Sequence, residues 1–311
     1  MGCDRSAWKS PRRVRATSIV LAILIASVCS VGRAASVHAQ EAPRFRAGVT
    51  VVPITAVVRD SRGRLVRDLA RDDFEVLENG RPRPIVDFRA TGHTPISLAL
   101  LFDTSGSMGE ANLDRGKAVV EALLNRMETA WDEMALFTFD KSLRGETPFT
   151  NDADVIRTAL GKTVAWGQTS LYDAIAEAAK RLGDRRTQRR AVVVITDGVD
   201  TSSTITPEKV SELASALEVP VYVLTVAPSR RRFFGGDDTL ADLAIRTGGV
   251  HVRAHLTEDL DTTISTMLAE LRQLYFLAID SATTAGSYRL EVRTKRKGLK
   301  VRARSGYVAT H

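Results

Sequence analysis

The spacing of apolar residues divides this chain into three parts, and the first has a β-type pattern. Between residues 49 and 88, short runs rich in Val, Ile and Phe alternate with two polar turns, Asp60-Ser61-Arg62-Gly63 and Glu78-Asn79-Gly80-Arg81. The second turn contains the Asn-Gly pair that is typical of a two-residue hairpin connection. This pattern predicts several short strands, with Pro53 at an edge or a bulge of its sheet.

From residue 96 the pattern changes to apolar runs that alternate with amphipathic stretches. The predicted strands cover residues 96–102, 134–139, 191–196, 219–226 and 250–253. The predicted helices include residues 171–182, 210–217 and 260–271, and the pair Gly248-Gly249 is expected to end a further helix. Strands that are apolar throughout are buried on both faces. The predicted fold class is therefore α/β, with a doubly wound, mostly parallel sheet and helices on both faces.

After residue 273 the pattern returns to β, with predicted strands at residues 274–279, 288–293 and 299–303. Neither β-rich end has enough strands to be stable alone, so the two are expected to form one β-sandwich in which the α/β domain is inserted. The predicted organisation is an N-terminal β segment at residues 41–92, an α/β domain at 93–273, and a C-terminal β segment at 274–311 that packs with the N-terminal one.

The first forty residues have the pattern of a secretory signal peptide. A basic head precedes an uncharged, mostly apolar run at residues 16–32, and Val37-His38-Ala39 resembles a small-x-small cleavage site. A membrane helix is the alternative, but the run is short for a span and carries several Ser and Thr residues. Residues 1–40 are therefore predicted to be cleaved, which places the protein in the periplasm, the cell envelope or the medium. It would be membrane-anchored if the signal stayed uncleaved.

Removal of this segment changes two conclusions from composition. The whole chain has a formal net charge of +7, but residues 41–311 hold 38 basic and 36 acidic residues, a net charge of +2. The high isoelectric point is therefore no argument for nucleic-acid binding. Both cysteines, Cys3 and Cys29, lie in the removed part, so the exported domain is expected to fold without disulfides.

Oxygen-bearing side chains occur in three loops of the predicted α/β domain. Asp103, Ser105 and Ser107 come directly after the strand at residues 96–102, Thr169 precedes a helix, and Asp197 ends the strand at residues 191–196. In doubly wound sheets, ligands bind at the carboxyl ends of the strands, so these five residues are expected to meet there. Two carboxylates and three hydroxyls suit a hard cation such as Mg²⁺ better than a soft metal.

The same loops lack the groups that catalysis needs. The Gly-x-Ser-x-Gly pattern of a nucleophilic serine is absent around Ser105, and no His occurs in the three loops. No glycine-rich phosphate loop precedes a helix. The chain is therefore predicted not to be an enzyme, and no catalytic residue is assigned.

Three other features have plain structural interpretations. His251 and His255 are too far apart on a strand to share a metal ion, since four residues span about 13 Å. The loop at residues 229–237 mixes Arg and Phe; a solvated loop is the default interpretation and a contact surface for an acidic partner the alternative. The basic residues between 293 and 304, Arg302 and Arg304 among them, partly alternate with apolar ones and are interpreted as the solvent face of a strand pair.

The set Asp103-x-Ser105-x-Ser107, Thr169 and Thr196-Asp197-Gly198 resembles the metal-ion-dependent adhesion site of von Willebrand factor type A (VWA) domains. The resemblance covers roughly residues 94–275 and implies a Rossmann-like fold. It also implies that Ser105, Ser107 and Thr169 bind Mg²⁺ by their hydroxyls, while Asp103 and Asp197 act directly or through water. The flanking sequences resemble those of a bacterial subgroup of exported VWA proteins.

In this family an Asp or Glu of a protein partner takes the open position on the metal. The resemblance therefore implies an exported binding protein that holds Mg²⁺, with Mn²⁺ or Ca²⁺ as alternatives, and docks an acidic residue of a protein partner. One alternative is an envelope structural or assembly component in which the metal only stiffens the loops. A metal-assisted hydrolase is a further alternative, which lacks a candidate base. Nucleic acid is not an expected partner, and no stable membrane span is expected after cleavage.

Overall fold

The structure is a computed structural model that describes residues 51–90, 94–128, 130–183, 185, 189–226, 236–253 and 259–309. These residues belong to one compact unit, Ala47–His311. The predicted signal peptide at residues 1–40 and most of the loop at residues 229–237 lie outside the described residues. Within the described ranges, no helix is both long enough and apolar enough to cross a membrane.

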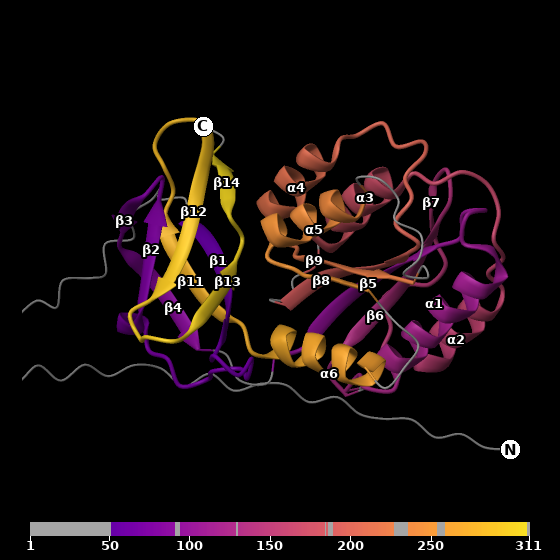
Figure 1. The fold of residues 1–311 in the computed structure, drawn as a ribbon, viewed down its shortest axis with the longest axis horizontal. Coiled ribbons are helices and arrows are strands. Elements are labelled where there is room, and N and C mark those ends of the chain that lie inside the picture. The colour runs from indigo at the N-terminus through magenta and orange to yellow at the C-terminus, as the bar shows by residue number, and fades with distance from the viewer. Residues whose placement is uncertain are drawn as a thin grey trace, which may run out of the picture. The chain divides into compact units, whose positions relative to one another are not determined.

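A six-stranded sheet in the order β10-β9-β8-β5-β6-β7 forms the centre of the α/β part (Figure 1). Its strands are β5 (Ile96–Asp103), β6 (Glu133–Phe139), β7 (Leu143–Gly145), β8 (Arg189–Thr196), β9 (Val221–Thr225) and β10 (His251–Arg253). Neighbouring strands are parallel, except that β7 pairs antiparallel with β6. The predicted fold class is confirmed. Because β5 lies between β6 and β8, the loops after these three strands share one edge of the sheet.

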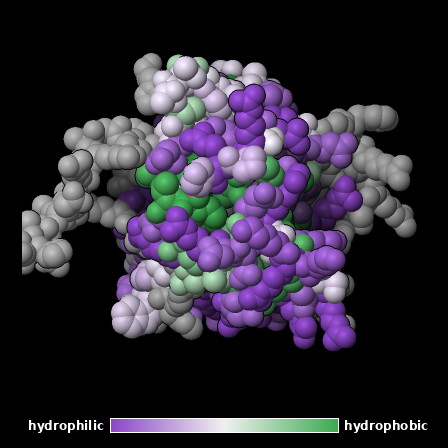
Figure 2. All heavy atoms as spheres, turned by 90° about the vertical axis from the view of Figure 1, so that its left-hand side faces the viewer, coloured by the Kyte–Doolittle hydropathy of each residue, from purple (hydrophilic) through white to green (hydrophobic). Residues whose placement is uncertain are grey.

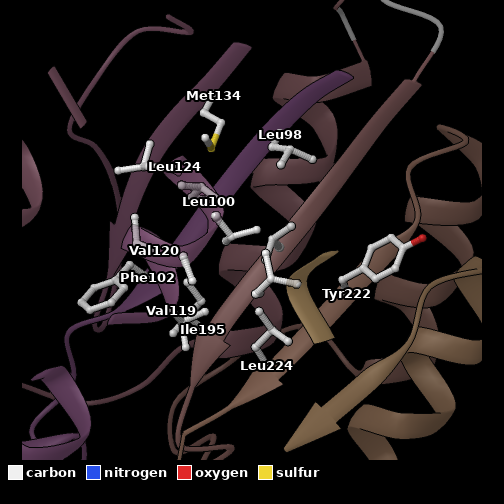
Figure 3. Packing of buried hydrophobic residues seen from close by; sticks show 14 of the residues in the cluster. Leu98, Leu100, Phe102, Val119, Val120, Leu124, Met134, Ile195, Tyr222 and Leu224 are labelled. Carbon is white, nitrogen blue, oxygen red and sulfur yellow. The ribbon is translucent and has the colours of Figure 1, made fainter. Parts of the chain in front are cut away.

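Helices cover both faces of this sheet because its central strand has no polar face. All of β5 is buried, with Leu98, Leu100 and Phe102 in one core cluster and Ala99 and Leu101 in the other. The first cluster, part of which Figure 3 shows, includes side chains of α1, α2 and α6, and the second includes those of α3, α4 and α5. The helices are α1 (Gly109–Leu124), α2 (Ala153–Gly161), α3 (Leu171–Gly183), α4 (Pro207–Ala216), α5 (Gly236–Thr247) and α6 (Asp259–Arg272).

The end of α5 shows why two glycines stand in sequence there. Gly248 has a φ of +88°, and its N–H donates to the carbonyl of Ile245 at 3.1 Å. The N–H of Gly249 donates to the carbonyl of Ala244 at 2.8 Å, which completes a Schellman motif. The expected helix stop is thus confirmed. Gly249 also lies against β9, where an added Cβ would come within 2.0 Å of the Val221 carbonyl oxygen.

This close approach predicts a large effect of a small substitution. Gly249→Ala is expected to lower the free energy of unfolding by about 3 kcal/mol, because the new methyl group overlaps backbone atoms that cannot move without distorting β9. Urea unfolding followed by circular dichroism measures the change. Gly161→Ala is the matched control, since nothing lies within 4 Å of its added Cβ, and it is expected to leave the stability equal or slightly higher.

Eight strands from the two ends of the chain form two further sheets. Their orders are β13-β1-β11-β4 and β14-β12-β2-β3. The strands are β1 (Val51–Arg59), β2 (Phe74–Glu78), β3 (Arg81–Arg83), β4 (Ile85–Ala90), β11 (Tyr275–Asp280), β12 (Gly286–Thr294), β13 (Lys300–Ala303) and β14 (Gly306–Ala309). A third core cluster lies between these sheets and includes Ile54, Phe74, Leu277 and Leu290. At the base of the inserted α/β domain, Ala90 of β4 pairs in register with Tyr275 of β11.

Each edge strand of one sheet is followed in sequence by, or follows, an edge strand of the other sheet. Only Pro84 separates β3 from β4, and only Arg304 and Ser305 separate β13 from β14. Each of these connections carries the chain from an edge of one sheet to the same side of the other. Pro84 suits such a corner because it has no N–H that a ladder would have to satisfy. The sandwich therefore protects its strand edges by turning corners.

The face in Figure 2 is mostly hydrophilic, with smaller apolar areas between the polar side chains. On β12, Leu290 and Val292 are buried while Arg289, Glu291 and Arg293 are exposed. This alternation is what a sheet with one dry and one wet face requires. The interpretation of the basic C-terminal residues as a solvent face therefore holds for Arg293.

The same interpretation is wrong for Arg302 and Arg304, which contact the α/β domain. Arg302 donates to the carboxylate of Glu270 on α6, and Arg59 of β1 donates to the same carboxylate at 2.8 Å. Arg304 is 7% exposed and donates to the carbonyl oxygens of Ser215, at the end of α4, and Pro53. A guanidinium is favoured at the carboxyl end of a helix, where unpaired carbonyls concentrate partial negative charge.

Candidate metal centre

Asp103 is the last residue of β5 and is completely buried. One of its carboxylate oxygens accepts a hydrogen bond from the Thr196 hydroxyl at 2.6 Å, and the other accepts one from the backbone N–H of Ser105 at 2.9 Å. Thr196 ends β8, the neighbouring strand, and its Oγ1 also accepts from the N–H of Gly198 at 3.1 Å. Two strands and two loops therefore fix the orientation of this carboxylate.

The two serine hydroxyls of the first loop lie together. Ser105 is buried and Ser107 is exposed, and their Oγ atoms are 3.1 Å apart. Two neighbouring ligands of an octahedral Mg²⁺ lie about 2.9 Å apart, since each Mg–O bond is about 2.0–2.1 Å long. The spacing of the hydroxyls is therefore suitable for two ligands of one cation.

Thr169 is held by hydrogen bonds to the segment that follows β8. Its N–H donates to the Thr201 hydroxyl at 2.9 Å, and its carbonyl accepts from the N–H groups of Thr201 and Ser202, each at 2.9 Å. The same loop also contacts the loop after β5, where the N–H of Gly106 donates to the carbonyl of Gly167 at 2.9 Å. The loop that carries Thr169 thus joins the loops that carry Asp103 and Asp197.

Asp197 follows β8 and is 5% exposed. Its carboxylate accepts from the N–H of Val199 at 3.1 Å, across the sharp turn that Gly198 makes with a φ of +88°. Its negative charge also acts on Asp103, whose pKa it raises. The structure therefore brings all three predicted loops to one edge of the sheet and the two carboxylates into one electrostatic environment.

The pKa of Asp103 is raised to about 7: burial raises it most, hydrogen bonds from Ser105 and Thr196 lower it, and the charge of Asp197 raises it. A carboxylate in this position is unfavourable as an anion unless positive charge lies nearby. No basic side chain is among the groups that shift this pKa. A divalent cation held between Asp103 and Asp197 would compensate both charges, so the donor set fits a hard metal ion.

The described residues contain no group of three or more His, Cys, Asp or Glu side chains that could hold a metal. This agrees with the composition of the candidate site, in which only Asp103 and Asp197 are carboxylates and three hydroxyls supply the other oxygens. The absence of thiol and imidazole donors favours Mg²⁺ over softer metals.

Sequence reasoning missed the residues that fix the start of α3 next to Thr169. Asp200 accepts from the N–H of Leu171 at 2.8 Å, and the Ser203 hydroxyl accepts from the N–H of Tyr172 at 2.9 Å. Asp173, in the first turn of α3, accepts in return from the N–H of Thr204 at 3.0 Å. The segment after β8 thus caps the helix in place of a local N-cap residue. Their Asp and Ser types are typical of caps, but nothing local in the sequence points to a helix 30 residues away.

The other candidate features do not join this site. The ring of His251 is within hydrogen-bond distance of the Thr225 hydroxyl, at 2.8 Å, and His255 lies outside the described residues. Burial lowers the pKa of His251. This is the environment of a half-buried structural histidine.

Residues 98–217 match the family model of the von Willebrand factor type A domain. A relative described as an uncharacterized protein of Borreliella burgdorferi is 24% identical over 179 residues, which are 49% of this chain and 52% of the relative. The chain thus spans about half the length of that relative.

The fold is similar to that of one solved von Willebrand factor type A protein. The structure of a von Willebrand factor type A protein from Catenulispora acidiphila has a TM-score of 0.50 at 12% identity, over 85% of this chain and 74% of that one. The conserved hypothetical protein BatB from Bacteroides thetaiotaomicron has a TM-score of 0.48 at 19% identity, over 57% of this chain and 98% of its own.

Proposed function

We propose that this chain, which contains a von Willebrand factor type A domain, is an exported binding protein whose metal centre docks an acidic side chain of a protein partner. The metal ligands would be Asp103, Ser105, Ser107, Thr169 and Asp197. The bound Mg²⁺ would supply a positively charged coordination position for the partner's carboxylate. A role in adhesion or in assembly of the cell envelope follows from this kind of docking.

The observation that carries the proposal is the arrangement around Asp103. Its buried carboxylate has its two oxygens held by Thr196 and Ser105, and its charge faces that of Asp197 without a basic neighbour among the groups that shift its pKa. Two carboxylates only partly neutralise a divalent ion, and the neutral hydroxyls add none of the negative charge that would repel a further anion. The donor set therefore supports the capture of one external carboxylate.

Binding is favoured over catalysis by the residue types in the site. Residues 103–107, 166–170 and 196–203 contain no His, Cys or Lys. Asp103 and Asp197 are assigned to the metal, and the third carboxylate of these segments, Asp200, accepts hydrogen bonds from the N–H of Leu171 and the hydroxyl of Ser203. None of the three is therefore assigned as a separate general base. Export is supported by the signal-like sequence of residues 1–40.

A purely structural metal is less well supported, because the loops already hold one another. Hydrogen bonds join residues 104 and 166, 106 and 167, and 169 and 201 without any contribution from a cation. A stiffening ion would add little to such a frame. The cation is therefore assigned to docking.

A pull-down from envelope extract tests this proposal. With the full-length chain as bait, a protein retained in Mg²⁺ is expected to elute when EDTA removes the ion, because its carboxylate loses its coordination partner. Mass spectrometry and immunoblotting of both eluates measure the retained fraction. The same partner held equally well in EDTA would contradict docking through the metal and favour the structural alternative.

A further inference from the structure

Trp166 lies beside the metal loops with its side chain in solvent. It is 78% exposed, and Val164 is 72% exposed; no other large apolar side chain of the described residues is as exposed as these two. A single exposed apolar side chain needs no explanation, but two within three positions, next to a candidate site, suggest a contact surface. Trp166 lies three positions before the predicted ligand Thr169, a distance of at most about 10 Å along the chain.

The backbone around Trp166 is fixed, so its exposure does not come from a loosely held loop. The N–H of Trp166 donates to the carbonyl of Thr104 at 2.7 Å, inside the loop that carries Asp103 and Ser105. Ala165 packs against the first core cluster, which turns its two neighbours outward. A tryptophan on a fixed backbone has only two side-chain torsions to lose when a partner covers it, and tryptophan is enriched at interface hot spots.

We propose that Trp166 and Val164 form the apolar half of the partner-binding surface, next to the metal. The partner is a protein segment that presents an Asp or Glu and, within three positions of it, an aliphatic or aromatic side chain that packs on the indole. This inference rests on the proposed function, since the metal sets where the carboxylate sits. The chain separation between Trp166 and Thr169 sets the spacing of the partner's two residues.

The choice of a protein segment rests on the chemistry of both halves. Val164 is a branched aliphatic side chain with no hydrogen-bonding group, and the exposed indole of Trp166, two positions along the chain, offers a second apolar surface. A partner side chain such as Leu or Phe removes both from water at once. Acidic sugars also combine a carboxylate with a ring that stacks on aromatics, and they serve as the competing class in the test.

The test uses a phage library of disulfide-constrained heptapeptides, panned on the full-length chain in Mg²⁺ and eluted with EDTA. Selected peptides are synthesised, and their dissociation constants are measured on the wild type and two variants. Peptides with an acidic and an apolar residue within three positions are expected. Trp166→Ala is expected to weaken their binding at least tenfold while its affinity for Mg²⁺ alone stays unchanged.

Trp131→Ala is the matched control. Trp131 is 67% exposed but precedes β6, at the edge of the sheet opposite to the metal loops, so its loss is expected to change peptide affinity by less than twofold. EDTA-eluted peptides that bind Trp166→Ala as tightly as the wild type would overturn the inference and leave the proposed function standing. Binding that survives EDTA, or a library without any Mg²⁺-dependent binder, would overturn the proposed function. Trp166-dependent binding of trigalacturonate in place of peptides would overturn the partner class.

Discussion

Replacement of Asp103 by Ala is expected to abolish Mg²⁺ binding. The carboxylate is the one member of the site that is completely buried and held at both oxygens, by Thr196 and Ser105. Its removal would leave Asp197 as the only anionic ligand, and a single carboxylate with neutral hydroxyls holds a hydrated Mg²⁺ weakly. Isothermal titration with Mg²⁺ measures the effect, and a loss of at least a hundredfold in affinity is expected by order of magnitude.

Two further variants show whether Asp103→Ala fails to bind Mg²⁺ because a ligand is missing or because the protein is unfolded. Asp103→Asn keeps the shape and the hydrogen-bond acceptor but removes the charge, so it is expected to fold and still fail to bind Mg²⁺. Asp114→Ala removes an exposed carboxylate from α1 and is expected to bind as the wild type does. Wild-type affinity in the folded Asp103 variants would refute the assignment of this metal centre.

Replacement of Glu270 by Ala is expected to lower the free energy of unfolding by several kcal/mol, about the cost of breaking a buried ion pair. Glu270 is 4% exposed and accepts hydrogen bonds from Arg59 and Arg302, which come from two strands of the sandwich. Its removal leaves two partly buried guanidinium groups without their counterion. Breaking a buried pair in this way costs about 3–5 kcal/mol, because an uncompensated charge stays out of water.

Urea unfolding of Glu270→Ala measures this loss, and Glu291→Ala is the matched control. Glu291 pairs with Arg293 on the outer face of the sandwich, where both side chains are about half exposed. Water and salt screen such a pair, so its removal is expected to change the stability by less than about 1 kcal/mol. Equal losses of stability in the two variants would show that the ion pairs of Glu270 stabilise the protein no more than an exposed pair does.

The fold class could be predicted because its main signals are local. Each buried strand of the sheet is a continuous apolar run, and each helix repeats its apolar residues at the period of an α-helix. The grouping of Asp103 and Asp197 at one edge follows from the parallel order of the strands, while Thr169 is held there by hydrogen bonds to the segment after β8. Their role as Mg²⁺ ligands stays a prediction, which the titration tests.

Long-range partners could not be predicted in the same way. Arg302 and Arg304 sit in an alternating basic stretch that looks like the wet face of a strand, yet they bond to residues 32 and 89 positions away. Asp200 looks like an ordinary loop residue until α3 is placed beside it. In each case the deciding contact comes from tertiary packing, which no sequence period encodes.

The register between Ala90 and Tyr275 has a consequence for how this protein can be remodelled. The chain leaves the sandwich after β4 and re-enters it at β11, and these two points are paired partners on adjacent antiparallel strands. A short turn could bridge them at little entropic cost, because the two ends already lie side by side. The α/β domain is thus an insertion between two paired strands. A domain with different binding specificity could replace it without a change in the β-sandwich.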